Sequence, residues 1–161
     1  AGAAGAGRRP ARHGTDRHVK YRMATALLTL VGTFVALYLY LYKIGRIGAL
    51  ACGTGGCETV QLSPYARFLG VEVSLIGLVG YAGLFAFTLW ALRPSLAEQR
   101  WPATVLTVLS GVGVLFAVYL TWLELFVIHA ICRWCVGSAL IITAVFVAAV
   151  LDRRAAAQAP R

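Results

Sequence analysis

Long runs without charged residues dominate the hydrophobic pattern of this chain. Three of them hold about twenty residues each: Met23–Tyr42, Val73–Leu92 and Ala103–Leu123. A fourth run, Val136–Leu151, becomes long enough if its helix begins near Cys135. A helix needs about 20 apolar residues to cross a bilayer core of ~30 Å, where unpaired backbone groups find no partner. The pattern therefore predicts an all-α membrane protein, a bundle of four transmembrane helices.

The predicted spans leave little chain for any other domain. We expect one membrane domain over residues 23–152, with spans at about 23–42, 73–92, 103–131 and 135–151. Residues 1–22 are rich in Ala, Gly and Arg, and we expect a disordered tail there, with a second tail at 153–161. Composition agrees, since 60% of the residues are hydrophobic and only 13% are charged, against roughly a quarter charged in soluble domains.

The net charge of +9 is distributed unevenly around the spans. Eleven of the fifteen Lys and Arg residues precede span one, join spans two and three, or follow span four, whereas the other two connections hold four: Lys43, Arg46, Arg67 and Arg133. Cytoplasmic segments carry the excess of Lys and Arg in membrane proteins. Both termini are therefore expected in the cytoplasm. No basic face of a folded surface is visible, so we expect no nucleic-acid partner.

The first external loop contains the start signal of a helix. Ser63 followed by Pro64 is typical of an N-cap and first helical position, and Gly70 is typical of a helix end. Apolar side chains along this segment predict a short amphipathic helix lying over the outer mouth of the bundle: Tyr65, Phe68 and Leu69. A simple connecting turn is the alternative.

All four cysteines fall in the two connections placed outside, where paired thiols become disulfides. Cys132 and Cys135 form a C-x-x-C at the start of span four, where the helix N-terminus and Arg133 favour the attacking thiolate. Cys52 and Cys57 flank Gly-Thr-Gly-Gly, a flexible loop that suits a shuttle. Two redox-active pairs are the favoured interpretation. A structural protein with static disulfides and a metal-binding protein with a four-cysteine zinc site are the alternatives.

Two segments resemble the vitamin K epoxide reductase family. One runs from Cys57 through Tyr81, with Ser63 six residues after the second loop cysteine and Gly-Leu-Val-Gly-Tyr in the next span. The other is Glu-Leu-Phe-Val-Ile-His-Ala-Ile-Cys-Arg-Trp-Cys, residues 124–135, whose Trp inside the C-x-x-C is similar to the bacterial branch. The resemblance covers residues 23–151 and keeps the order of the family's parts, a loop pair after span one and a C-x-x-C opening span four.

This resemblance implies a thiol-disulfide oxidoreductase of the bacterial cytoplasmic membrane, built around a quinone such as menaquinone or ubiquinone. It implies that a thioredoxin-like partner passes electrons to Cys52, that Cys57 exchanges with Cys132, and that Cys135 reduces the quinone. Ser63 matches the family's characteristic loop serine. Many bacterial members carry a fused thioredoxin-like domain, and with none in this sequence we expect the partner to be a separate protein.

The sequence departs from the family's pattern at three positions. Animal members have a Tyr after the C-x-x-C and an Asn in span two that contact the naphthoquinone, and Ala139 and Val73 stand there. Glu72 stands where bacterial members often have Pro. These departures favour plain quinone reduction over epoxide reduction.

Three further polar residues are candidates for the site. Glu124 lies about two helical turns below the C-x-x-C, and an acid near the membrane core is a candidate proton donor to the quinone; its alternative is a place among the lipid headgroups. Tyr81 is a candidate to bond a quinone oxygen or to cap a neighbouring helix. His129 can shuttle protons or bond to nearby backbone. Gly77, Gly80 and Gly83 predict a smooth face for close helix packing.

Overall fold

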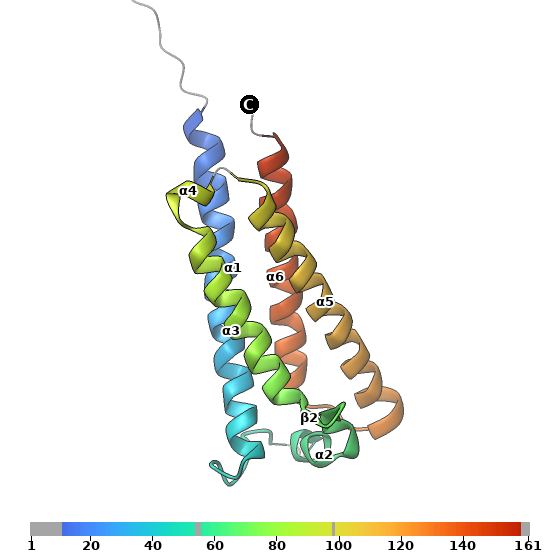
Figure 1. Cartoon of the computed structure of the whole chain (residues 1–161). Helices are drawn as coiled ribbons and strands as arrows, with labels where there is room; N and C mark the ends of the chain where they lie inside the picture. The colour runs from blue at the N-terminus through green and yellow to red at the C-terminus, as the bar shows by residue number, and fades with distance from the viewer. Residues whose placement is uncertain (1–10, 54–55, 98, 159–161) are drawn as a thin grey trace, which may run out of the picture.

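Four long helices run side by side in the computed structural model, which describes residues 11–53, 56–97 and 99–158. They are α1 (Ala11–Lys43), α3 (Val73–Ala91), α5 (Trp101–Leu123) and α6 (Arg133–Gln158) (Figure 1). Each holds, or continues into, a stretch long and apolar enough to cross a membrane: Val19–Lys43, Val73–Ala91, Trp101–Ile128 and Arg133–Ala157. The predicted fold class, a four-helix membrane bundle, is confirmed.

The bundle is not equally tight on all sides. Helix α1 packs along α3 and α6, and α5 packs mainly along α6, whereas α3 and α5 make few contacts. A core of Tyr81, Leu84, Leu106, Ile142 and Val145 fills the centre. Gly77 lets α3 approach Ala36 of α1, but no described atom of a neighbouring helix lies within 4 Å of the Cβ positions of Gly80 and Gly83. Of the three glycines predicted to form a packing face, only the first serves that purpose.

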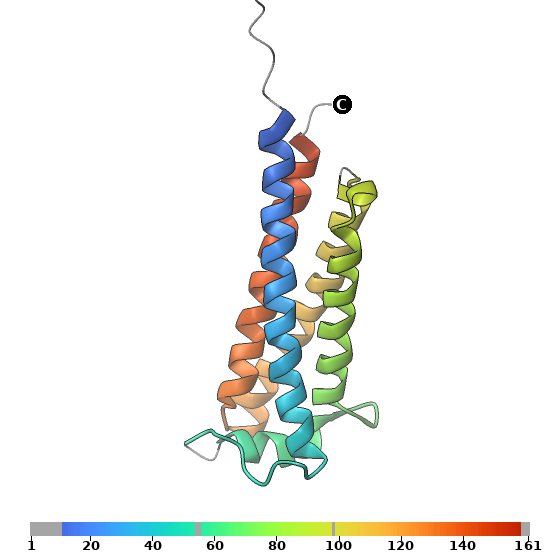
Figure 2. The same ribbon diagram turned by 90° about the vertical axis from the view of Figure 1, so that its left-hand side faces the viewer.

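Both described ends of the chain lie at one end of the bundle, where α1 starts and α6 finishes (Figure 2). Arg22 is 2% exposed there, and its Nε donates to Asp152 Oδ2 over 3.0 Å. Its Nη1 donates to the carbonyl oxygen of Ala91 over 2.6 Å. A buried charge requires such partners. Part of the expected tail 1–22 is therefore helical from Ala11 onward, and residues 1–10 lie outside the described chain.

The opposite end holds the connection between α1 and α3. It contains helix α2 (Gly56–Leu62), the 3-10 turn η1 (Pro64–Ala66), and an antiparallel hairpin of β1 (Arg67–Phe68) and β2 (Val71–Glu72). At the end where α1 starts and α6 finishes, the short helix α4 (Pro94–Ala97) links α3 to α5 (Figure 1). A short helix in the first loop is thus confirmed.

The Ser63–Pro64 signal marks the start of the 3-10 turn η1, with Ser63 at its N-cap and Pro64 as its first residue, and the longer helix α2 precedes it. Helix α2 ends at Leu62, and the Ser63 hydroxyl donates to the Val60 carbonyl over 2.8 Å instead of capping an N–H group. Gly70, expected to end a helix, turns the hairpin together with Leu69, since both have positive φ angles of 84° and 51°. Two consecutive residues of this kind are the signature of a tight hairpin turn.

Candidate redox site

The C-x-x-C occupies the first turn of α6. The carbonyl of Cys132 accepts the first intrahelical hydrogen bond, from the Val136 N–H, so Cys132 is the N-cap residue. Its sulfur accepts from the Cys135 N–H over 3.3 Å, in the place of a capping side chain. Cys132 is fully buried and Cys135 half-buried, and both are free thiols.

Glu124 is brought to this turn by an irregular helix end. After α5 the chain makes one π-helical turn, η2 (Glu124–Ile128), and His129 then adopts a left-handed conformation with φ 54°. The chain reverses, so that the Cys132 N–H donates to Glu124 Oε2 over 3.0 Å. Glu124 is 4% exposed, and its carboxylate and the sulfurs of Cys132 and Cys135 lie within 4.8 Å of one another. The acid is buried against the thiols.

The surroundings of Cys132 favour its ionised form. The hydrogen bond from the Cys135 thiol lowers the pKa of Cys132, and backbone N–H groups at the start of α6 add to this, against the opposing effects of burial and the Glu124 charge. The net direction is downward. The thiolate is the form that takes part in disulfide exchange, so these contacts favour the exchange-competent form of Cys132.

The other pair lies beside it in the oxidised form. Cys52 and Cys57 are joined by a disulfide, and they are 2% and 1% exposed. Cys57 stands in the first turn of α2, and both residues belong to the same apolar cluster as Cys132. Thr54 and Gly55 of the Gly-rich loop lie outside the described residues. Three of the four sulfurs are therefore buried together at one end of the bundle.

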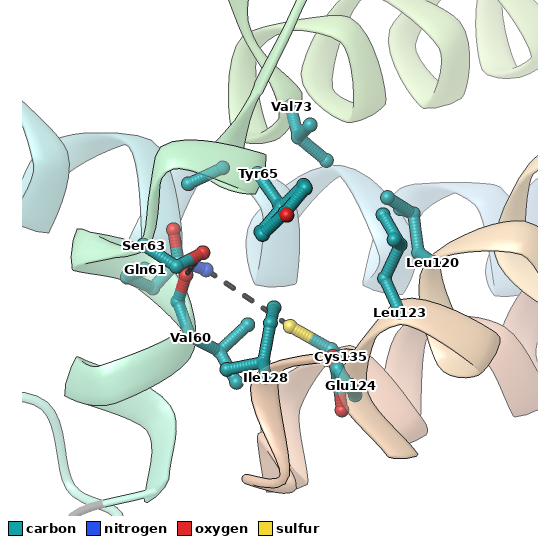
Figure 3. A pocket seen from close by; sticks show the side chains of 11 residues that line it. Val60, Gln61, Ser63, Tyr65, Val73, Leu120, Leu123, Glu124, Ile128 and Cys135 are labelled. Carbon is teal, nitrogen blue, oxygen red and sulfur yellow. Dashed lines mark hydrogen bonds between the residues drawn. The ribbon is translucent and has the colours of Figure 1, made fainter. Parts of the chain in front are cut away.

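Beside Cys135 lies a small pocket, drawn in Figure 3. Its wall combines polar groups of Gln61, Ser63 and Glu124 with apolar side chains of η1, α3, α5 and η2, among them Val73, Leu123 and Ile128. The volume is about 40 Å³, room for roughly three water molecules. The Gln61 amide nitrogen lies 4.0 Å from the Cys135 sulfur.

Gln61 lines the pocket beside Cys135 but was not predicted from the sequence. It is 7% exposed, and its backbone carbonyl accepts from Lys43 Nζ over 2.5 Å. Lys43 also pairs with Glu72 of the hairpin, with nitrogen and oxygen 3.3 Å apart. The spacing could have indicated it, because Gln61 lies four residues after Cys57 and residues at that spacing share one face of a helix.

Comparison with known families agrees with this geometry. A sequence model of the vitamin K epoxide reductase family matches residues 23–150. The chain belongs to the vitamin K epoxide reductase family. As a member of that family, with four helices able to cross a membrane, it is a membrane oxidoreductase.

Not every residue suggested by the family resemblance reaches the pocket of this family member. Tyr81 lies in the bundle core, where its hydroxyl donates to the Ser138 carbonyl of α6 over 2.7 Å. Its ring passes Gly32 of α1, and any larger residue there would collide with it. Tyr81 therefore bridges helices and is not among the lining residues.

Of the residues at the family's quinone contacts, Val73 lines the pocket of Cys135. Ala139 instead lines a separate hollow on the α5–α6 side, with Val118 and Thr143. Ser63 also lines the first pocket, although its hydroxyl is engaged by the Val60 carbonyl. The polar groups nearest to Cys135 are thus Gln61 and Glu124, which differ from the Tyr and Asn of animal members.

Proposed function

We propose that this protein oxidises the thiols of a separate thioredoxin-like protein outside the cell membrane and passes the electrons to a membrane quinone. The observation that carries the proposal is the placement of both cysteine pairs at one end of a membrane bundle. There the Cys135 sulfur borders a pocket whose wall is otherwise mainly apolar. Such a pocket suits a lipid-soluble acceptor, and the neighbouring disulfide suits a water-soluble donor.

Electrons enter by two exchange steps at the first pair. A partner thiolate attacks Cys52, a mixed disulfide forms, and Cys57 leaves as a thiolate. The partner's second thiol then attacks its own sulfur in the mixed disulfide and releases Cys52. The partner is now oxidised, and Cys52 and Cys57 hold two electrons as thiols.

Transfer to the second pair follows the same chemistry. The Cys57 thiolate attacks Cys132 of a Cys132–Cys135 disulfide and releases the Cys135 thiolate. Cys52 then attacks Cys57, which restores the first disulfide and releases Cys132. After this step the first pair is joined and the second pair holds two free thiols.

The residues around Cys135 fit the last step. In that step the Cys132 and Cys135 thiols form a disulfide again, and their two electrons and two protons would pass to a bound quinone. Cys135 presents its sulfur to the pocket, Glu124 can hold a proton beside it, and the Gln61 amide can donate a hydrogen bond to a ring oxygen. The pocket of about 40 Å³ is smaller than a quinone ring, so we expect it to widen on binding. Tyr65, half exposed at its edge, is the side chain best placed to move.

Charge sets the proposed orientation. The start of α1 and the end of α6 lie at one end of the bundle, and the α1–α3 connection and the start of α6 lie at the other (Figures 1 and 2). The four cysteines belong to these last two segments. In the sequence, eleven of the fifteen Lys and Arg residues precede span one, join spans two and three or follow span four. Positively charged segments remain in the cytoplasm, so we place the cysteines outside the bacterial cytoplasmic membrane, where the thiol partner is found.

The test is partner-driven quinone reduction by the purified protein. Reduced thioredoxin-like protein and menaquinone are mixed with the oxidoreductase in detergent, and quinone absorbance is followed. Cys132→Ala and Cys135→Ala should each reduce turnover to background, whereas Val147→Ala, on the exposed face of α6, should leave it unchanged. Full turnover without either thiol would show that the cysteines are static, and stoichiometric zinc in the purified protein would favour a metal site.

A further inference from the structure

The backbone of α2 closely approaches the backbone that leads into the C-x-x-C where Gly56 faces Ile131. A Cβ atom on residue 56 would lie 2.5 Å from the Ile131 carbonyl oxygen and 3.5 Å from the Ile131 nitrogen. Cβ atoms in proteins essentially never come within 3.0 Å of another heavy atom of this kind. Because the opposing atoms belong to the backbone, no side-chain rotation can relieve the contact.

The contact lies directly beside two sulfurs. Cys57 follows Gly56, Cys132 follows Ile131, and these cysteines are 1% and 0% exposed within one apolar cluster. The segment carrying Ile131 cannot retreat easily, because hydrogen bonds to Glu124 fix it on both sides. The Ala130 N–H donates to the Glu124 carbonyl over 3.1 Å, and the Cys132 N–H donates to the Glu124 side chain.

We propose that Gly56 is a positioning residue that sets the approach of Cys57 to Cys132 and so controls transfer between the two pairs. The inference rests on the proposed function and adds to it the geometry of its central step. In that step the Cys57–Cys132 bond forms, the Cys132–Cys135 bond breaks, and the electron pair leaves on Cys135. Attack of this kind requires the three sulfurs close together and aligned.

A rough displacement follows from the contact distance. To bring a Cβ from 2.5 Å to an ordinary contact of at least 3.4 Å, α2 must move by about 1 Å. A misplacement of that size can slow a positioned reaction by about 10²-fold. Gly48 provides the matched control, because it lies in the same connection, has nothing within 4 Å of its own Cβ position and does not adopt a positive φ.

The experiment isolates the two sulfurs in the full-length protein. In a Cys52→Ala, Cys135→Ala background only Cys57 and Cys132 remain, and diamide joins them by accepting two electrons and two protons. Samples are quenched with a maleimide at intervals, and the Cys57–Cys132 peptide is quantified by mass spectrometry. We expect Gly56→Ala to slow crosslinking by between 10- and 100-fold. Gly48→Ala and Ile131→Ala should leave the rate unchanged, since the latter keeps its carbonyl.

A second readout in the four-cysteine protein separates positioning from misfolding. Gly56→Ala should retain the Cys52–Cys57 disulfide and the dithiothreitol-driven reduction of quinone, because dithiothreitol can reduce the second pair directly, while partner-driven turnover falls. Equal crosslinking rates in Gly56→Ala and its parent would overturn the inference and leave the proposed function intact. A parent protein that forms no Cys57–Cys132 crosslink would overturn the proposed function as well. Loss of both turnover assays together would also refute the positioning role.

Discussion

The two ends of this bundle bury polar groups in different ways. At the end with the termini, Arg22 is sealed between Asp152 and backbone carbonyls, at distances typical of strong hydrogen bonds. At the cysteine end, the Cys135 sulfur lies within 4.8 Å of the Cys132 sulfur and the Glu124 carboxylate, and its contact with the Gln61 amide is weak, at 4.0 Å. The indole nitrogen of Trp134 is buried there without a partner among the described residues. A fully satisfied polar cluster holds helices in place, whereas an incompletely satisfied one retains capacity to bind and react.

The largest expected effect is a loss of stability on breaking the Arg22–Asp152 ion pair at the end with the termini. Arg22→Ala removes the guanidinium that pairs with the buried Asp152 carboxylate, and loss of one partner from a buried ion pair costs about 3–5 kcal/mol. Thermal unfolding in detergent measures this loss, with Arg153→Ala as the exposed control on α6. Turnover per folded molecule should stay unchanged. A stability equal to that of the control would show that the ion pair contributes nothing.

At the cysteine end the next largest effect is chemical. Glu124→Gln keeps an oxygen to accept from the Cys132 N–H but cannot release a proton at neutral pH. We expect turnover with quinone to fall about 10²-fold, the contribution typical of general acid catalysis, with little change in unfolding temperature. Glu124→Asp, which retains the acid, should recover part of the activity. Full activity of Glu124→Gln would assign the acid a purely structural role.

Gln61→Leu should have a smaller effect on the same reaction. It removes the amide beside Cys135 but leaves the bond from Lys43 intact, because that bond is made to the backbone carbonyl. Loss of one neutral hydrogen bond corresponds to about 1 kcal/mol, and we expect turnover to fall roughly 5- to 10-fold. Exchange between the reduced partner and Cys52 should not change. A slower first step would place the role of Gln61 elsewhere.

The smallest effect concerns the hairpin and depends on pH. Burial would raise the pKa of Glu72, but the hydrogen bond from Arg67 and the charge of Lys43 outweigh it and hold this pKa below its ordinary value of 4.5. The ion pairs therefore stabilise the fold above pH 4.5, and this contribution is lost as the pH falls through the lower, folded pKa. Unfolding of Glu72→Gln should be less pH-dependent than that of the unmodified protein in this range. The difference should be at most about 1 kcal/mol, since Arg67 is largely exposed.

The same contrast between the ends shows what the sequence could predict. Uncharged runs of sufficient length reveal spanning helices because the bilayer imposes a simple composition rule, and the C-x-x-C is visible because its residues are adjacent. The partner of Arg22 is not visible, since Asp152 lies 130 residues away. The Ser63–Pro64 signal marks a helical start, but this helix ends at Ala66, because the chain continues into a hairpin that turns at Leu69 and Gly70.

The irregular turn after α5 has a consequence that substitutions do not test. A π-helical turn contains one residue more than an α-helical turn, so the backbone after Ile128 is rotated relative to a regular helix. With 3.6 residues per turn, removal of one residue would swing everything beyond it by about 100° around the axis. Cys132 and Cys135 would then face away from α2, although every side chain of the site was still present. In this segment the number of residues is constrained more tightly than their identity, and a single-residue deletion would be more damaging than most replacements.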